Sequence, residues 1–335
     1  MKILVTGAAG FIGFHTAAAL LAAGHDVVGV DNFDAYYDVA LKRARVAEIA
    51  GHPKFKMVEL DLADRVGTAE LFANGGFERV VHLAAQAGVR YSIDHPHAYI
   101  DANIAGFLNV LEGCRHTKAG HCVFASSSSV YGANTTMPFR VEDNVDHPLS
   151  LYAATKKANE LMAHSYAHLY RLPLTGLRFF TVYGPWGRPD MAMYRFTERI
   201  FRGEAIDVYN RGHHARDFTY IDDVVKGVLG ALDHVAMPDP FWNSAHPSPA
   251  TSAAPYRIYN IGNARPTELM TLIACIERAT GREAIKRFLP MQPGDVPATA
   301  ADLSALLAAV GFAPSTPIET GVERFVEWYR RYHKV

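Results

Sequence analysis

Short runs of apolar, mostly β-branched residues alternate with longer helix-like stretches through the first half of the chain. The runs carry few charges, as strands buried on both faces of a sheet should, and they occupy residues 3–5, 27–30, 57–60, 80–84, 122–125 and 174–180. The stretches between them are long enough for crossover helices, among them residues 12–23, 98–114 and 151–170. This alternation predicts an α/β fold built on a doubly wound, Rossmann-type parallel sheet, with any ligand at the carboxyl ends of the strands.

The second half of the chain loses this regular alternation. Helix-like stretches occur at residues 191–202, 222–234, 268–280 and 318–332, and a proline-rich segment at residues 237–255 predicts a long loop. We expect residues 1–180 to form the Rossmann domain and residues 181–335 to form mainly a smaller, mixed α/β lobe that covers the strand ends and binds the substrate. Segments around residues 216–262 are expected to return to the first domain.

The charge of the chain is nearly balanced, which narrows the classes of partner. Its 335 residues include 33 Lys and Arg against 34 Asp and Glu, for a formal net charge of −1. The general field that draws proteins to nucleic acid or to anionic membranes is therefore missing, and we expect neither partner. The three cysteines have no metal-ligand spacing and are too few for a disulfide scaffold. We expect a cytoplasmic protein with no secretory leader, no membrane span and no metal.

A glycine-rich loop follows the first predicted strand and opens the first predicted helix. Gly7, Gly10 and Gly13 have the spacing GxxGxxG. In such loops the first glycine permits a tight turn, the second lets the backbone approach a pyrophosphate, and the third lets helix and strand pack closely. The N-terminus of the helix then presents unpaired N–H groups to phosphate oxygens. The loop therefore predicts a dinucleotide site.

Acidic residues at the ends of the next two strands fit the same ligand. Asp31 ends the second predicted strand, where a carboxylate accepts hydrogen bonds from an adenosine ribose and would repel a 2′-phosphate. This favours NAD over NADP. Asp61 and Leu62 end the third strand, where they are placed to meet the adenine.

A tyrosine and a lysine supply a candidate base. Tyr152 and Lys156 lie four residues apart in a predicted helix, so their side chains share one face. A free phenol titrates near 10, and an adjacent ammonium stabilises the phenolate and lowers its pKa toward neutrality. Four serines, at positions 126–129, end the fifth predicted strand. One of these hydroxyls can hydrogen-bond a reacting hydroxyl and share its proton with Tyr152.

These motifs occur in the chain order of the extended short-chain dehydrogenase/reductase superfamily of nucleotide-sugar enzymes, which the sequence resembles. More narrowly, it is similar to the UDP-glucuronate 4-epimerases. The narrower resemblance rests on SSSVYG at 127–132, SLYAATKKANE at 150–160, LRFFTVYGPWGRPDM at 177–191, RDFTYIDD at 216–223, APYRIYNIG at 254–262 and QPGDV at 292–296. The blocks extend over essentially the whole chain.

The resemblance implies a UDP-sugar substrate and NAD as cofactor. In the implied reaction, Tyr152 removes the proton of the sugar 4′-hydroxyl while hydride passes from C4′ to NAD⁺. The 4-keto sugar then rotates in the pocket and takes the hydride back on its other face. The resemblance further implies that Lys156 binds the nicotinamide ribose, Ser127 holds the 4′-hydroxyl and Arg216 meets the diphosphate. It also implies a homodimer through the helices at residues 98–114 and 151–170.

Two positions bear on the identity of the sugar and the reaction. A 4-keto uronate is a β-keto acid that loses CO₂ unless its carboxylate is held, and we expect Thr181 and Arg188 to hold it. Galactose-type epimerases carry Asn at the position of Thr181, and the planar fork of arginine matches a carboxylate. Dehydratases and decarboxylases carry acidic residues where this chain has Ser128 and Ser129. UDP-glucose 4-epimerase, UDP-glucuronate decarboxylase and a non-enzymatic NAD-binding scaffold remain as alternatives.

The expected site residues serve catalysis, cofactor binding or substrate binding. The expected catalytic residues are Tyr152, Lys156 and Ser127. The expected cofactor contacts are Gly7, Gly10, Phe11, Ile12, Gly13, Asp31, Asn32, Asp61, Leu62, Leu83, Ala84, Ala85, Tyr152 and Lys156. The expected substrate contacts are Ser127, Ser128, Thr181, Arg188 and Arg216.

Overall fold

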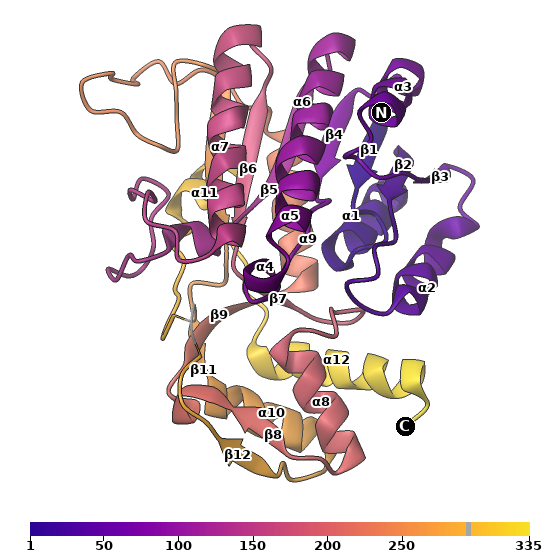
Figure 1. Cartoon of the computed structure of the whole chain (residues 1–335), viewed down its shortest axis with the longest axis vertical. Helices are drawn as coiled ribbons and strands as arrows, with labels where there is room; N and C mark the ends of the chain where they lie inside the picture. The colour runs from indigo at the N-terminus through magenta and orange to yellow at the C-terminus, as the bar shows by residue number, and fades with distance from the viewer. Residues whose placement is uncertain (293–295) are drawn as a thin grey trace.

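The computed structural model describes residues 1–292 and 296–335, and its largest element is a parallel sheet (Figure 1). Within the described residues this sheet has seven strands in the order β10-β6-β5-β4-β1-β2-β3. They are β1 (Lys2–Thr6), β2 (Asp26–Asp31), β3 (Phe55–Glu59), β4 (Arg79–His82), β5 (His121–Ser127), β6 (Leu174–Phe179) and β10 (Tyr256–Ile261). The order contains the 3-2-1-4-5-6 arrangement of a doubly wound dinucleotide-binding sheet, and the predicted fold class is confirmed.

Helices cover both faces of this sheet because its strands are apolar on both sides. Ile3 and Val5 of β1 belong to one core cluster, and Leu4 between them belongs to another. The first cluster includes α1 (Phe11–Ala22) and α9 (Ile221–Asp233), and the second includes α3 (Arg65–Gly75), α6 (Gly106–Thr117) and α7 (Leu151–Tyr170). Helix α2 (Val39–Ala50) packs against β3. The sheet is thus the middle layer of three.

The helix predicted at residues 98–114 is present but is not a regular α-helix throughout. After the short helices α4 (Tyr91–Asp94) and α5 (Pro96–Tyr99), residues Ile100–Ala105 form a π-helix that continues into α6. The wider turn holds Asn103, whose side chain accepts from the Gln86 backbone N–H at 2.8 Å and donates to Thr155 Oγ1 at 3.0 Å. These bonds join a cavity-lining loop to α7, and π-helical turns often occur at functional sites.

The strand predicted at residues 174–180 is present, and a second short strand of another sheet follows it directly. It ends as β6 at Phe179, and the chain continues as β7 (Thr181–Tyr183), which pairs with β9 (Ala215–Tyr220). Strand β9 also pairs, antiparallel, with β11 (Pro266–Glu268), and β8 (Ile206–Val208) pairs with β12 (Lys286–Phe288). The short sheets and the helices α8 (Ala192–Arg202), α10 (Leu269–Thr280) and α12 (Ile318–His333) form the smaller lobe below the sheet in Figure 1.

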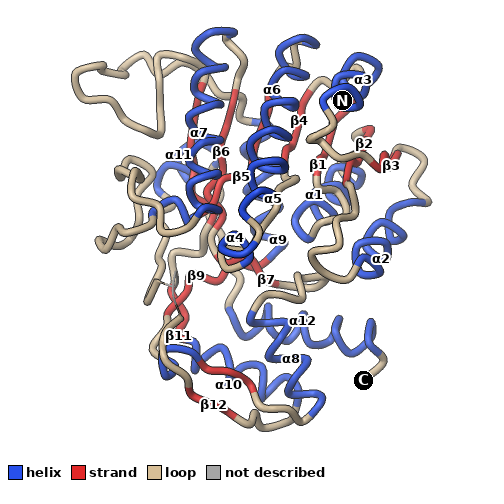
Figure 2. Tube along the Cα trace, in the orientation of Figure 1, coloured by secondary structure: helices blue, strands red, loops and turns tan. Residues whose placement is uncertain are grey.

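Later segments return to the large sheet. Strand β10 pairs in parallel with β6, and α11 (Ser304–Val310) packs against α9 and β10. The proline-rich segment 237–255 contains no helix or strand and projects as a loop beside α7 (Figure 2). The division of the chain into two domains at residue 180 stays a prediction. Three residues of the QPGDV block, Pro293, Gly294 and Asp295, lie outside the described residues. Among the described helices, none combines the length and the apolar character needed to cross a bilayer.

Candidate active site

A cavity of about 970 Å³ lies at the carboxyl ends of the sheet strands and is lined by both the Rossmann half and the smaller lobe. It lies at the upper end of the range of roughly 300–1,000 Å³ that is typical of small-molecule sites. All the residues expected to contact cofactor or substrate line this cavity: Gly7, Gly10, Phe11, Ile12, Gly13, Asp31, Asn32, Asp61, Leu62, Leu83, Ala84, Ala85, Ser127, Ser128, Tyr152, Lys156, Thr181, Arg188 and Arg216. Their individual roles stay predictions.

The glycine loop forms a cradle that side chains would fill. Gly7 has a φ of 68°, and a Cβ there would lie 2.8 Å from the backbone nitrogen of Ala84. A Cβ on Gly13 would lie 2.0 Å from the carbonyl oxygen of Gly7. Helix α1 begins after Gly10, and no side chain of the described residues caps its first turn. The first-turn N–H groups therefore remain open to an anion, which fits a dinucleotide pyrophosphate.

Two backbone N–H groups hold the carboxylate that ends β2. Asp31 accepts from Ala9 at 3.1 Å and from Phe33 at 2.9 Å. Asn32 donates from Nδ2 to Asp61 Oδ2 at 3.1 Å, so the ends of β2 and β3 are joined at the expected adenosine end.

Lys42 was not predicted, although it lines the same part of the cavity. Its side chain is buried, with Nζ 4.8 Å from the ring centroid of Tyr37, and burial lowers the pKa of its amine against the attraction of Asp31. A buried cation beside a ligand-binding carboxylate is a sign of function. The sequence offered only a weak signal, because helix α2 has no strong apolar face.

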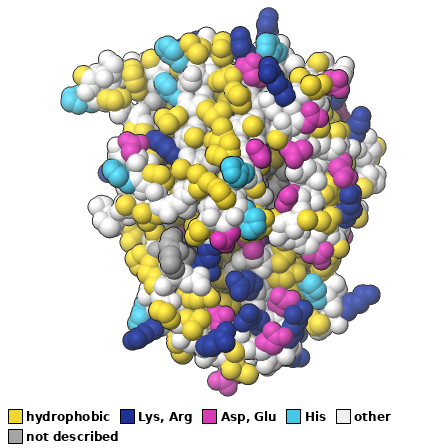
Figure 3. Space-filling model, viewed as in Figure 1, with side chains coloured by type: hydrophobic (Ala, Val, Ile, Leu, Met, Phe, Trp, Pro, Cys, Tyr) yellow, Lys and Arg dark blue, Asp and Glu magenta, His cyan; other side chains and the backbone are white. Residues whose placement is uncertain are grey.

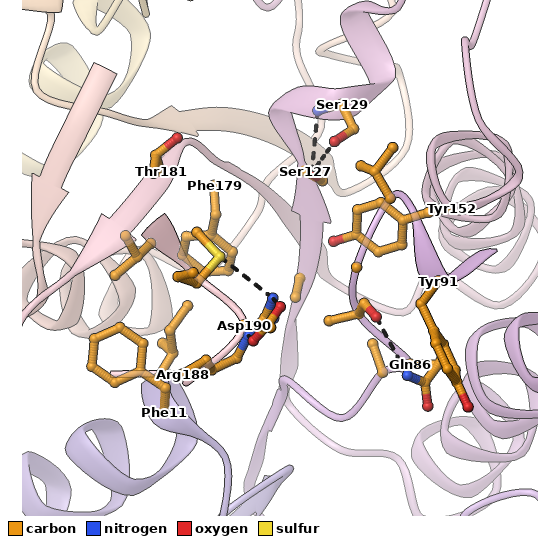
Figure 4. Close-up of a pocket in the computed structure, with 18 of the residues that line it drawn as sticks. Phe11, Gln86, Tyr91, Ser127, Ser129, Tyr152, Phe179, Thr181, Arg188 and Asp190 are labelled. Atoms are coloured by element: carbon orange, nitrogen blue, oxygen red, sulfur yellow. Dashed lines mark hydrogen bonds and ion pairs between the residues drawn. The ribbon is translucent and has the colours of Figure 1, made fainter. Parts of the chain in front are cut away.

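The three expected catalytic residues come from two neighbouring elements. Ser127 is the last residue of β5, and Tyr152 and Lys156 lie on the first turns of α7. Figure 4 shows Tyr152 beside Ser127, with its phenol oxygen directed into the cavity. Ser127 Oγ donates to Ser129 Oγ at 3.1 Å and accepts from the Ser129 backbone N–H at 3.1 Å. The expected meeting of a serine hydroxyl with Tyr152 at the sheet edge agrees with this arrangement.

Burial and two neighbouring side chains act on the pKa of Tyr152. Burial raises the pKa of its phenol, while a hydrogen bond with Ser127 and the charge of Arg188 lower it in part. The amine of Lys156 donates to the carbonyl of Ala125 at 3.0 Å, and burial lowers its pKa to about 8. The expectation that Lys156 lowers the pKa of Tyr152 stays a prediction. The amine is directed at a carbonyl and is itself desolvated.

A buried ion pair behind these residues was also not predicted. Arg178 on β6 donates to both carboxylate oxygens of Glu160 on α7, at 2.9 and 3.0 Å, and both side chains are buried. Ser126, next to Ser127, donates to Glu160 at 2.6 Å. This network joins β5, β6 and α7 directly behind the residues that line the cavity.

Arg188 is paired within its own loop. Its Nε and Nη2 atoms donate to Asp190 Oδ1 and Oδ2 at 3.0 and 2.7 Å, and Tyr36 donates its hydroxyl to Asp190 Oδ2 at 3.1 Å. The charge of Asp190 raises the pKa of Arg188, and Arg188 holds the pKa of Asp190 below its ordinary value, in both cases against the effect of burial. Figure 4 shows the pair in the middle of the pocket, with Thr181 some way from it. Neither Asp190 nor Tyr36 was predicted.

Arg216 lies on β9, in the wall that the smaller lobe contributes. Its Nη1 donates to the carbonyl oxygens of Ala215 and Pro297, each at 3.1 Å. The diphosphate contact expected for it stays a prediction. The described residues contain no group of three or more side chains suited to hold a metal ion.

Comparison with known proteins identifies the family. The sequence pattern of the NAD dependent epimerase/dehydratase family matches residues 3–262. The chain belongs to this family. It is 53% identical to Protein CapI of Staphylococcus aureus over all of both chains. It is 48% identical to UDP-glucuronate 4-epimerase 2 of Arabidopsis thaliana, over 100% of this chain and 77% of the relative.

A solved structure agrees with this assignment. The crystal structure of UDP-glucuronic acid 4-epimerase from Bacillus cereus, in complex with UDP-glucuronic acid and NAD, is similar with a TM-score of 0.88. The two sequences are 32% identical, and the match covers 99% of this chain and 100% of that one. As a member of the NAD dependent epimerase/dehydratase family, this protein uses NAD, and the cradle formed by Gly7 and Gly13 fits the pyrophosphate of that cofactor.

Proposed function

We propose that this protein is a UDP-glucuronate 4-epimerase that interconverts UDP-glucuronate and UDP-galacturonate with tightly held NAD. The observation that carries this proposal is the identity of about one half, over the whole chain, with a relative of that name. The convergence of the expected cofactor and substrate residues on one cavity supports it. A cavity that must accept a dinucleotide and a nucleotide sugar is also expected to be large.

In the proposed mechanism, Tyr152 takes the proton of the sugar 4′-hydroxyl and later returns it. NAD, when bound, would supply the hydride acceptor for C4′ and, after its reduction, the hydride donor. Ser127, which hydrogen-bonds Tyr152, holds the 4′-oxygen next to the phenol, so the proton has only a short distance to move. Lys156 holds the ribose near the nicotinamide. Walls from both halves of the chain keep the 4-keto sugar in the cavity while it rotates.

The uronate carboxylate distinguishes this reaction from that of a neutral sugar. Once C4′ is oxidised, C5′–C6′ cleavage would release CO₂ if that bond stood perpendicular to the ketone plane. Arg188 and Thr181 hold the carboxylate near the plane and so suppress this loss. Ser128 and Ser129 leave no carboxylate beside Ser127, which disfavours the dehydratase and decarboxylase alternatives.

One experiment separates the candidate functions. Purified protein is incubated with UDP-glucuronate and, separately, with UDP-glucose, without added NAD, and the products are followed by NMR. Formation of UDP-galacturonate only, in the first sample, supports the proposal and shows that the protein retained its cofactor. Conversion of UDP-glucose would indicate the galactose-type alternative, a pentose product would indicate decarboxylation, and no reaction in either sample would indicate a scaffold.

We also propose a homodimer through the helices at residues 98–114 and 151–170. The neighbouring helices α6 and α7 expose Leu108, Leu161 and Leu169, and Figure 3 shows apolar side chains gathered over them. An exposed apolar surface of this kind is typical of an interface. Leu161→Asp should therefore give monomers in analytical ultracentrifugation, while Leu307→Asp on α11, a similarly exposed position, should stay dimeric. A monomeric unmodified protein would contradict the proposal.

The proposed location is the cytoplasm. Cys114, Cys122 and Cys275 are free and buried, and free thiols persist in a reducing compartment. Nucleotide-sugar conversion at a retained cofactor needs no other compartment.

A further inference from the structure

The ion pair between Arg188 and Asp190 leaves part of the guanidinium available. Asp190 occupies Nε and one N–H of Nη2, and the sulfur of Met191 lies 3.6 Å from Nη2. Among the residues that the structure describes, no acceptor meets the two N–H groups of Nη1. One guanidinium carries five donors in a fixed plane, so Arg188 can hold a second carboxylate while it keeps the first.

Asp190 is held in this position from the opposite half of the chain. The Tyr36 hydroxyl donates to it, and the Tyr36 ring packs against Tyr91 with their centroids 4.7 Å apart. The side chains of Arg188 and Asp190 are only 24% and 26% exposed, so water screens their charges weakly. The cavity therefore presents a partly neutralised cation where an anionic sugar would bind.

A substrate that must rotate makes this partial neutralisation useful. After oxidation, the carboxylate of the keto sugar must leave its first position before the other face of C4′ can take the hydride. An unshared arginine would stabilise the first bound state, and such binding lowers KM without raising kcat. A guanidinium shared with Asp190 holds the carboxylate less tightly and lets it leave.

We propose that Asp190 is a positioning residue that shares the Arg188 guanidinium with the substrate carboxylate and so permits rotation of the keto sugar. The inference rests on the proposed function, because it requires a uronate substrate. In this proposal Asp190, held by Tyr36, weakens the hold of Arg188 on the substrate carboxylate, which Arg188 without Asp190 would bind more tightly.

Asp190→Asn is the direct test, since the amide keeps the shape and removes the charge. With UDP-glucuronate as the probe, we expect KM to fall and kcat to fall, each by about tenfold, the scale of one hydrogen bond to a charged group. The fraction of enzyme with reduced nicotinamide at steady state, read from its absorbance, should rise because the keto sugar waits longer before it rotates. A merely structural role would not move KM and this absorbance in these directions.

Two further variants make the test decisive. Asp190→Glu keeps the charge and should leave KM and kcat close to the unmodified values, and Asp26→Asn, at an exposed carboxylate at the start of β2, should change neither. An unchanged or higher KM in Asp190→Asn overturns the proposal, as does an Asp190→Glu variant that behaves like Asp190→Asn. If Asp190→Asn does not fold, Tyr36→Phe, which removes the hydroxyl that holds Asp190, should lower KM and kcat in the same directions, and an unchanged or higher KM in that variant overturns the proposal. If the unmodified protein does not convert UDP-glucuronate, the proposed function fails first and this inference fails with it.

Discussion

At Tyr152, burial and two neighbouring side chains act on the phenol in opposite directions. Desolvation raises its pKa, whereas Ser127 and the charge of Arg188 lower it. At neutral pH this residue is therefore a neutral phenol, hydrogen-bonded to Ser127. Proton removal depends on what enters the cavity, and a cationic nicotinamide is a charge that would favour the phenolate.

Replacement of the phenol oxygen is the simplest residue-scale test. Tyr152→Phe keeps the ring and its edge contact with Tyr99, whose centroid lies 6.1 Å away. Because it removes the proton acceptor, kcat for UDP-glucuronate should fall by about 10²–10⁴-fold, as is typical for general acid–base groups. Turnover measured by NMR checks this, with Tyr170→Phe on the exposed end of α7 as the matched control. Near-native turnover would show that Tyr152 is not the base.

A second residue-scale prediction concerns the sugar carboxylate. Arg188→Ala removes the guanidinium and leaves Asp190 as an unpaired charge in the cavity, so both attraction and orientation of the uronate are lost. We expect epimerisation to fall by at least about tenfold and a UDP-4-keto-pentose to form through loss of CO₂. Product analysis by NMR measures both effects, and Arg65→Ala, at the start of α3, is a control. Undiminished epimerisation without a pentose product would refute the carboxylate clamp.

At the scale of elements, the Arg178–Glu160 pair determines how α7 lies against β5 and β6. Glu160 is one turn after Lys156, and its carboxylate also accepts from Ser126, which precedes Ser127. The two catalytic segments are therefore fixed to each other through one buried carboxylate. Breaking such a pair leaves an uncompensated charge in the interior.

This contact gives an element-scale prediction. Glu160→Gln should lower the free energy of unfolding by about 3–5 kcal/mol, because Arg178 would stay buried without its counter-charge. Chemical denaturation measures the change. Glu59→Gln is the matched control: its partner Arg43 is exposed, so the loss should stay below about 1 kcal/mol. Equal effects of the two substitutions would contradict the assignment of Glu160 as a structural anchor.

The same elements show what could be predicted from the sequence. Period and apolar character identify the sheet strands and α7, because they report which faces are buried. The spacing of the glycines identifies the cofactor cradle, because the tight turn and close packing of the local backbone require glycine at those positions. The periodicity of apolar residues does not indicate which side chains contact each other when they are far apart in the sequence. The pairs Glu160–Arg178 and Tyr36–Asp190, separated by 18 and 154 positions, therefore required the three-dimensional structure.

At the scale of the whole molecule, a nearly neutral chain must bind two anionic ligands. The groups that attract these anions are therefore concentrated in the cavity. Its lining includes the N-terminus of α1 and four cationic side chains, those of Lys42, Lys156, Arg188 and Arg216. The balance of 33 basic against 34 acidic residues is consistent with this arrangement, because charged side chains outside the cavity do not have to attract the anionic ligands. Solvation, not recognition, is the ordinary role of such surface charges.

Three histidines with strongly lowered pKa values make the stability of the whole fold depend on pH. Burial, with a smaller contribution from the charge of Lys156, lowers the pKa of His82 to about 3, and burial lowers the pKa values of His15 and His121 to about 4. The rings of His82 and His121 are almost fully buried, and His82 shares a hydrogen bond with Thr6 Oγ1 at 2.8 Å. In the unfolded chain all three histidines titrate near 6.5. The folded state therefore binds fewer protons than the unfolded state between these values.

The sign of the pH dependence follows from this difference. Above about pH 6.5 these histidines do not reduce the free energy of unfolding. As the pH falls from there toward its folded-state pKa, each of them lowers the free energy of unfolding by about 1.4 kcal/mol per pH unit. Urea unfolding measured from about pH 7 to about pH 5 should show a continuous loss. His82→Gln removes one of these three rings and should make the slope shallower by about a third, while the exposed His97→Gln should leave it unchanged. A free energy of unfolding that stays constant over this range would show that the fold keeps none of these rings neutral.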